Sequence, residues 1–205
     1  GHAGPSDVHT AELETSALGV AARTADLDML GGLLGAKADP SLEDSSGRAP
    51  LLWATLVDSH QCVSLLLAAK ANPTAKGPDG KAAAHIAAAR GLAGPLEAMI
   101  DMSERKKDKK ATDRLLSDEA QGLTPLHAAA AANEAGCCLL MLAAKASHEA
   151  RAGGELSPLH LASAQGAGAA IRVLLAARAD VGLTSVRSQK TALHFAAEHG
   201  RSAAA

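Results

Sequence analysis

The clearest evidence for the fold lies in Gly122-Leu123-Thr124-Pro125-Leu126-His127-Ala128-Ala129, because its central four residues return at a fixed interval. Thr124-Pro125-Leu126-His127 recurs as Ser157-Pro158-Leu159-His160 and as Thr191-Ala192-Leu193-His194, which places the three histidines 33 and then 34 residues apart. A second marker, a cation followed by alanine, keeps the 33-residue spacing on either side of one longer interval, at Lys37, Lys70, Lys145 and Arg178. Two markers with one period indicate an array of structural repeats.

The composition restricts the fold class. Alanine supplies 49 of the 205 residues, and the chain has one tryptophan, one phenylalanine and no tyrosine. β-Sandwiches and barrels draw on β-branched and aromatic residues, whereas alanine and leucine favour closely packed helices. Buried alanine provides little apolar area, which excludes a thick globular core. We therefore predict an all-α protein, an α-solenoid in which short helix pairs share their faces with their neighbours.

These residues resemble the ankyrin repeat, whose signature combines a Thr-Pro-Leu-His start, an Ala-Ala pair and a leucine-rich second helix. The resemblance implies about five and a half repeats with short β-turn or hairpin tips. We place an N-terminal extension at 1–15 and a single solenoid at 16–205, with repeats at about 16–42, 43–75, 76–117, 118–150, 151–183 and an incomplete 184–205. The chain departs from the family where the four cations replace the glycine after the second helix, and where Gly19 takes the histidine position of repeat one.

Repeat three holds a basic insertion near 103–113, because His85 lies 42 residues before His127, one period plus nine. The run from Glu104 to Arg114 has six cations and three anions, a net charge of +3. Because the whole chain has a net charge of −2, the rest of it carries about −5. We expect the second helix either to continue into the insertion or to give way to a charged loop. Its cations form either a solvated protrusion or a docking point for an acidic protein face or for lipid or nucleic-acid phosphate. These cations are Arg105, Lys106, Lys107, Lys109 and Lys110. Nucleic acid is the weakest of these partners, because the chain lacks aromatic residues for base stacking.

Histidine and cysteine do not suggest a reactive site. Four of the nine histidines share one repeat position, and stacked helices lie about 8–10 Å apart, too far to share a zinc ion with bonds of about 2.0–2.1 Å. The resemblance assigns this histidine a local hydrogen bond that ties neighbouring repeats. Cys62 and Cys137 occupy a slot that holds Met29 and Ala170 elsewhere, which predicts packing in the core rather than a reactive thiolate. We predict no enzyme activity, catalytic residue, metal site or cofactor.

The resemblance also implies a concave face that binds other proteins and includes two positions of each first helix. We define this concave face as Arg23 and Thr24, Leu56 and Val57, Ala89 and Arg90, Ala131 and Ala132, Ala164 and Gln165, Glu198 and His199. The pair Leu56-Val57 is apolar where the family is usually polar, so it either anchors a partner or packs beneath a neighbouring tip. The tips would supply a polar rim of Glu43, Asp44, Ser45, Lys76, Arg151, Ser185 and Arg187. Acidic pairs at the tips, such as Asp118-Glu119, are expected to be solvated.

Three functions are compatible with these features. We expect a non-catalytic interaction module or scaffold that binds a protein partner and no small-molecule substrate. The first alternative is a structural accessory subunit of a large assembly, organellar and membrane-associated, whose neighbour covers the incomplete last repeat. The second alternative is a regulatory fragment of an enzyme whose catalytic domain lies outside the chain.

The sequence also limits the expected location. No run of about 18 apolar residues predicts a membrane span, although peripheral contact with a membrane complex is compatible with the sequence. We therefore expect an intracellular, soluble protein, either cytoplasmic or, if a removed targeting segment preceded Gly1, organellar.

Overall fold

The structure, a computed structural model, describes residues 17–105, 109–153 and 155–201, and for residues 104 and 105 it describes the backbone alone. The predicted N-terminal extension at 1–15 therefore lies outside the described residues. So do Lys106 and Lys107 of the insertion, the side chain of Arg105 and the last residues of repeat six, 202–205.

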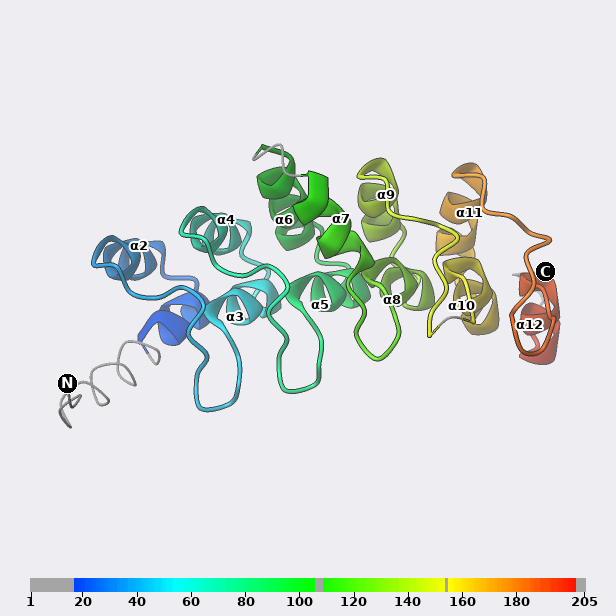
Figure 1. The fold of residues 1–205 in the computed structure, drawn as a ribbon, viewed down its shortest axis with the longest axis horizontal. Helices are drawn as coiled ribbons and strands as arrows, with labels where there is room; N and C mark the ends of the chain where they lie inside the picture. The colour runs from blue at the N-terminus through cyan, green and yellow to red at the C-terminus, as the bar shows by residue number, and fades with distance from the viewer. Residues whose placement is uncertain (1–16, 106–108, 154, 202–205) are drawn as a thin grey trace.

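Two rows of helices run along an elongated molecule (Figure 1). The first helices of the repeats form one row, with a helix at 17–24, α3 (Pro50–Leu56), α5 (Ala83–Arg90), α8 (Pro125–Ala131), α10 (Pro158–Gln165) and α12 (Ala192–Glu198). The second helices form the other row, with α2 (Leu27–Gly35), α4 (His60–Ala68), α6 (Ala93–Arg105), α9 (Ala135–Ala143) and α11 (Gly168–Ala176). This arrangement confirms the predicted all-α solenoid.

The predicted tips project beyond the first-helix row (Figure 1). Four of them are closed by one antiparallel bridge each, at Lys76–Ala82, Ala120–Leu123, Ala152–Leu156 and Thr184–Thr191. Because each bridge is isolated, the tips are short turns rather than strands of a sheet.

Local sequence sets where the helices begin and end. Thr124, Ser157 and Thr191 cap α8, α10 and α12, and in each case the histidine three residues later accepts a hydrogen bond from the cap's backbone N–H. These are capping boxes with histidine in the place of glutamate or glutamine. After the second helices, Lys37, Lys70, Lys145 and Arg178 have φ of 67°, 70°, 68° and 65°. This left-handed conformation is the one that favours glycine, so the cations fill a glycine position at a conformational cost.

The core is a thin layer that neighbouring repeats share. Alanine is fully buried where the first helices of successive repeats pack, at Ala54, Ala87, Ala88, Ala129, Ala130, Ala162 and Ala196. Leucine and methionine fill the space between the two rows, at Leu30, Leu51, Leu66, Leu96, Leu126, Met141 and Leu174. Small side chains at the contacts let the helices approach closely, so a modest apolar area is buried efficiently.

The cysteine slot faces the preceding repeat. Cys62 and Cys137 are buried, and Cys137 Sγ lies 3.8 Å from the carbonyl oxygen of Ala87. Burial raises the pKa of Cys137 to about 11 and that of Cys138 to about 12, which keeps both thiols protonated. Met29 was expected to be buried at the same phase but is 40% exposed. The reason is that repeat one has no described repeat before it.

The described residues of the insertion lie in two helices. The second helix of repeat three continues to Arg105, as one of the two sequence alternatives predicted, and a further helix, α7 (Lys109–Ser117), follows. Leu115 and Leu116 bury one face of α7 against the array, and Thr112 Oγ1 donates to Ser103 Oγ at 2.8 Å. Lys109, Lys110 and Arg114 are exposed on α7. The alternation of buried and charged positions makes α7 amphipathic.

Candidate functional site

The residues of the concave face lie at corresponding places near the ends of the first helices and remain accessible. The exposed members are Arg23, Thr24, Val57, Ala89, Arg90, Ala132, Gln165, Glu198 and His199. Leu56, Ala131 and Ala164 are half-buried. Because equivalent positions of stacked repeats lie side by side, these residues form one continuous strip along the array.

The apolar pair at the end of α3 is open to solvent. Val57 is 39% exposed and Leu56 is half-buried. Val57 is therefore not covered by a neighbouring tip, which was the alternative to an anchor. Trp53, Leu56 and Val57 lie at spacings of three and four residues, so the three side chains share one face of the helix.

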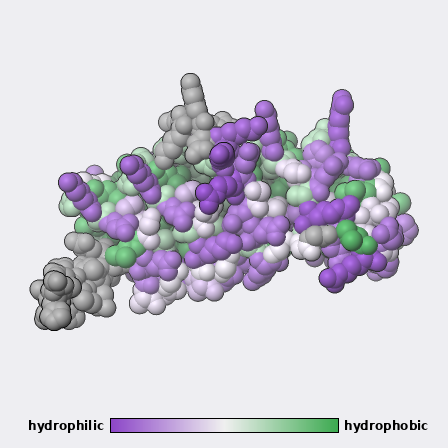
Figure 2. Space-filling model, viewed as in Figure 1, coloured by the Kyte–Doolittle hydropathy of each residue, from purple (hydrophilic) through white to green (hydrophobic). Residues whose placement is uncertain are grey.

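In this view hydrophilic surface covers the tips and also projects from the upper edge of the array, and apolar surface shows between them along the second-helix row (Figure 2). Glu43 and Ser45 are exposed as predicted. Ser185 is fully buried instead, and its hydroxyl accepts a hydrogen bond from the backbone N–H of Lys190 at 3.3 Å. Ser185 therefore closes its own tip and does not belong to the polar rim.

Three cations and one carboxylate of the predicted rim bond within the chain. Arg151 donates to the carbonyl oxygens of Glu155 at 3.0 Å and Thr184 at 2.9 Å. Arg187 lies 3.6 Å from the Glu155 carboxylate, but its side chain is 85% exposed. Because screening weakens so exposed a pair, Arg187 stays available to a partner.

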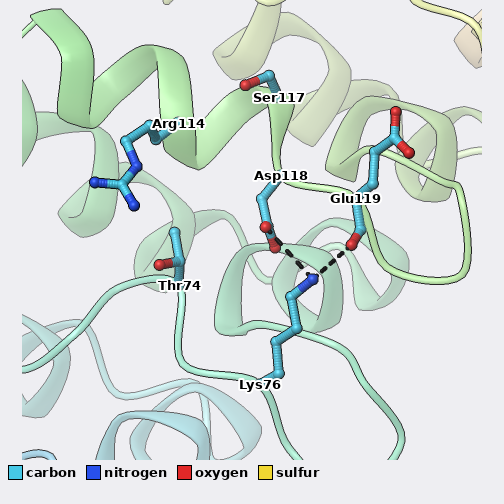
Figure 3. A pocket seen from close by; sticks show the side chains of 6 residues that line it. All are labelled: Thr74, Lys76, Arg114, Ser117, Asp118 and Glu119. Atoms are coloured by element: carbon cyan, nitrogen blue, oxygen red, sulfur yellow. Dashed lines mark hydrogen bonds and ion pairs between the residues drawn. The ribbon is translucent and has the colours of Figure 1, made fainter.

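Lys76 is exposed, as expected for the rim, but its ammonium contacts repeat four. Its ammonium lies 3.5 Å from Asp118 Oδ1 and donates to the carbonyl oxygen of Glu119 at 2.7 Å (Figure 3). Asp118 was expected to be solvated, and the structure corrects this, since its carboxylate joins the contact between two repeats. Arg114 of the insertion helix lies across the same hollow of about 430 Å³. The lining pairs two cations with two acidic residues, Asp118 and Glu119, so the hollow has no excess charge to select an ion.

Asp44 organises the tip of repeat two. Its carboxylate accepts hydrogen bonds from the backbone N–H of Ser46 at 2.8 Å and of Arg48 at 3.1 Å, and from Trp53 Nε1 at 2.7 Å. Burial alone would raise the pKa of Asp44, but the hydrogen bonds from Ser46, Trp53 and the backbone outweigh it and hold the pKa below its usual 3.8. The bond to Trp53 links the tip to α3.

The repeated histidines tie each repeat to the tip of the next. Nε2 of His127 lies 3.0 Å from the carbonyl oxygen of Leu156, and Nε2 of His160 lies 3.1 Å from that of Lys190. Since a carbonyl oxygen only accepts, Nε2 carries the proton, and Nδ1 accepts from the capping residue of its own helix. The neutral ring is therefore the form that satisfies both contacts.

His85 departs from this pattern. Its Nε2 lies 3.1 Å and 3.0 Å from the carbonyl oxygens of Asp118 and Leu123. Ala82 caps its helix and offers no hydroxyl to Nδ1. Nδ1 and Asp118 Oδ2 are both buried 3.9 Å apart, and neither has a hydrogen-bond partner among the described residues. The tie between repeats three and four therefore lacks one of its usual bonds.

We expect the free energy of unfolding to fall as the pH drops below 6.5. Burial lowers the pKa of His127 and of His160 below the usual 6.5, so below that pH the unfolded chain binds more protons than the folded chain. The stabilisation is complete above pH 6.5 and is lost as the pH falls towards the lowered pKa values. Urea denaturation on both sides of pH 6.5 measures how the free energy of unfolding changes with pH.

His127→Asn should reduce this pH dependence. His199→Asn, at an exposed histidine, is the control and should leave the pH dependence unchanged. A rise in the free energy of unfolding on acidification would contradict the assignment.

The sequence did not assign a role to Trp53 and Arg48. The guanidinium carbon of Arg48 lies 5.1 Å from the centroid of the Trp53 ring, and that of Arg23 lies 5.8 Å from it. Trp53 could have been singled out as the only tryptophan in the chain. It stands where other repeats place Ile86, Ala128, Leu161 and Phe195.

The described residues contain no group of three histidine, cysteine or acidic side chains that could hold a metal ion. None of the described helices is both long and apolar enough to cross a membrane.

Stacked helix pairs with projecting tips, tied by one repeated histidine, define a helical repeat solenoid. The family model for ankyrin repeats (three copies) matches residues 18–113 and 95–185, and the chain belongs to the ankyrin repeat family. The crystal structure of EF0377, an ankyrin repeat protein, is similar to this chain with a TM-score of 0.79 and 19% sequence identity, over 93% of this chain and 94% of that one. At this identity the likeness concerns the fold alone. No curated protein matches the chain. Ankyrin repeats are generally non-catalytic modules of protein–protein interaction.

Proposed function

We propose that this protein is a non-catalytic interaction module or scaffold that binds a partner protein through its concave face and turn tips. The observation that carries the proposal is the exposed apolar end of α3, where Leu56 and Val57 lie next to Trp53 on one helix face. Interface centres are rich in aromatic and apolar anchors surrounded by polar groups. Here the surrounding polar groups come from the tips, with Glu43 and Arg187 exposed.

The rest of the concave face favours close approach of a partner protein rather than a catalytic role. Ala89, Ala132 and the half-buried Ala131 and Ala164 leave the ends of the first helices nearly bare. A partner segment can therefore lie close to the helix backbones, while Arg90 and Gln165 offer hydrogen bonds at its sides. Such a surface gains affinity from shape complementarity and from a few anchors.

The double substitution Leu56→Glu, Val57→Glu is expected to weaken binding of the partner by about tenfold or more, since truncating or charging a central anchor costs about 2 kcal/mol or more. The partner is first identified by crosslinking mass spectrometry on native extract, and its affinity is then measured by titration. Helicity is expected to stay the same because Val57 is exposed.

Leu139→Glu is the matched control, because Leu139 is an exposed apolar residue of α9 on the second-helix row, 56% accessible. This control should bind the partner as the unaltered chain does. Binding that survived the double substitution but was lost with Leu139→Glu would move the interface to the second-helix row and overturn the proposal.

A second candidate, a structural subunit of a larger assembly, is favoured by the surface of α12. Leu193 is 56% exposed, while Leu126 and Leu159 at the same repeat position are 1% and 3% exposed. A neighbouring protein that covered Leu193 would extend the stack. Leu193→Glu would then abolish assembly while leaving binding at the Leu56-Val57 end unchanged.

A further inference from the structure

The concave face has an aromatic and cationic cluster at its N-terminal end. It consists of Trp53 on α3, Arg23 at the end of the helix at 17–24 and Arg48 in the tip of repeat two. Both guanidinium groups lie over the indole ring, at 5.8 Å and 5.1 Å from its centroid. Cations at these distances from a tryptophan ring are held by the ring's negative face.

The indole is fixed in place by its surroundings. Its Nε1 donates to Asp44 Oδ2 at 2.7 Å, and Asp44 is itself held by the backbone of the tip. On the side of repeat one, Gly19 occupies the histidine position of the repeat, and a Cβ added there would lie 3.9 Å from Trp53 Cδ1. At the equivalent positions of repeats five and six, His160 packs edge to face on Phe195 with ring centroids 5.5 Å apart. Glycine in place of the histidine removes that ring from beside the indole.

The two arginines keep donors for a ligand. Among the described residues, the Arg23 guanidinium contacts the Trp53 ring and no carboxylate, and the side chain is exposed. Arg48 Nη1 donates to Ser46 Oγ at 3.2 Å, and its other side-chain N–H groups have no hydrogen-bond partner among the described residues. The oxygens of Asp44 accept from Trp53 and the tip, and its carboxylate forms no ion pair with either guanidinium among the described residues. The two arginines and this one carboxylate together keep a net charge of +1. Guanidinium groups recognise carboxylates through paired hydrogen bonds.

We propose that this cluster binds a carboxylate in an acidic segment of the partner protein, and that an apolar residue of the same segment packs on Leu56 and Val57. The assignment rests on the proposed function and deepens it by stating the chemistry of the partner. Leu56 and Val57 follow Trp53 by one turn on the same helix face, so charge and apolar surface are adjacent. A nucleic acid is a poorer fit, since guanidinium groups already lie over the ring on which a base would stack.

The test selects binders from a random linear peptide library displayed on phage, with the whole chain as the target. Trp53 is the only tryptophan and the chain has no tyrosine, so a change in intrinsic fluorescence reports binding at the cluster. Peptides that change this fluorescence are expected to be rich in Asp and Glu with a nearby apolar residue. Arg23→Gln should weaken them by about tenfold or more, since a hydrogen bond to a charged group contributes about 1.5–3 kcal/mol. Their binding should also weaken as the ionic strength rises.

Arg172→Gln is the matched control, because Arg172 is an exposed arginine of α11 on the second-helix row, away from the single indole and from the concave face. It should bind the selected acidic peptides as tightly as the unaltered chain. Neutral or basic peptides at the cluster, acidic peptides that ignore Arg23→Gln, or tighter binding of oligodeoxythymidine than of the peptides would each overturn the proposal. If the peptides ignored Arg23→Gln but were lost with Leu56→Glu, Val57→Glu, the concave-face function would stand without the acidic partner. If the binding of no peptide changed with any concave-face substitution, the concave-face function and the acidic partner would both be wrong.

Discussion

Leu126→Ala is expected to lower the free energy of unfolding by about 2–5 kcal/mol, the range of large-to-small substitutions in protein cores. Leu126 is 1% exposed on α8, a helix that packs between α5 of repeat three and α10 of repeat five. Its neighbours include the buried Ala129 and Ala130, whose side chains are too short to move into the cavity. Urea denaturation followed by circular dichroism measures the loss.

The chain offers a matched control for this substitution at the same repeat position. Leu193 of α12 corresponds to Leu126 but is 56% exposed. Leu193→Ala should therefore change the free energy of unfolding by about 0.5 kcal/mol or less, as surface substitutions usually do. Equal losses at both positions would mean that the leucine contributes through its own helix rather than through the contact between repeats.

Ala130→Leu is expected to destabilise the array by about 1–3 kcal/mol, because extra methyl groups in a close-packed contact force the neighbouring groups apart. Ala130 is fully buried on α8. Leucine has the higher apolar area and almost the same helix propensity as alanine, so the loss would come from packing and not from the helix itself. A shift of the urea midpoint at unchanged slope is the expected observation.

Ala197 is the equivalent alanine of α12 and is exposed. Ala197→Leu should leave stability nearly unchanged, since the added methyl groups extend into solvent. If Ala130→Leu were neutral as well, the alanine-rich contacts would have spare room and the account of the core given above would be wrong.

The period in the sequence was enough to predict the solenoid, the tips and the buried alanine contacts, because each depends on the repeat position alone. Features that depend on differences between repeats could not be predicted in this way. Met29 is exposed because of its place in the first repeat, and Ser185 is buried by the closure of its own tip. Lys76 meets a carboxylate because repeat four has Asp118 at the equivalent tip position, where repeats five and six have Arg151 and Thr184.

In the candidate functional site, too, some residues follow from the repeat position and others from differences between repeats. Leu56 and Val57 were predicted to lie on the concave face from their phase, and in the structure Val57 is exposed and Leu56 is half-buried. The cluster around Trp53 could not be predicted, because it joins a helix of repeat one, a tip and a helix of repeat two. Its signal in the sequence was a pair of departures from the family pattern, Gly19 without a side chain and a lone tryptophan beside it in the next repeat.

The histidine ties described above are unevenly distributed along the chain, and this sets how far a local opening spreads. His85, His127 and His160 bond repeats three to six to one another, whereas Gly19 and Leu52 hold the same position in repeats one and two. In a stacked array an opening crosses an interface only as far as that interface couples two units. From the histidine bonds we expect the last four repeats to form the larger cooperative unit and the end that carries Trp53 to open at lower cost. A partner bound at this end would stabilise the part of the array that is otherwise least protected.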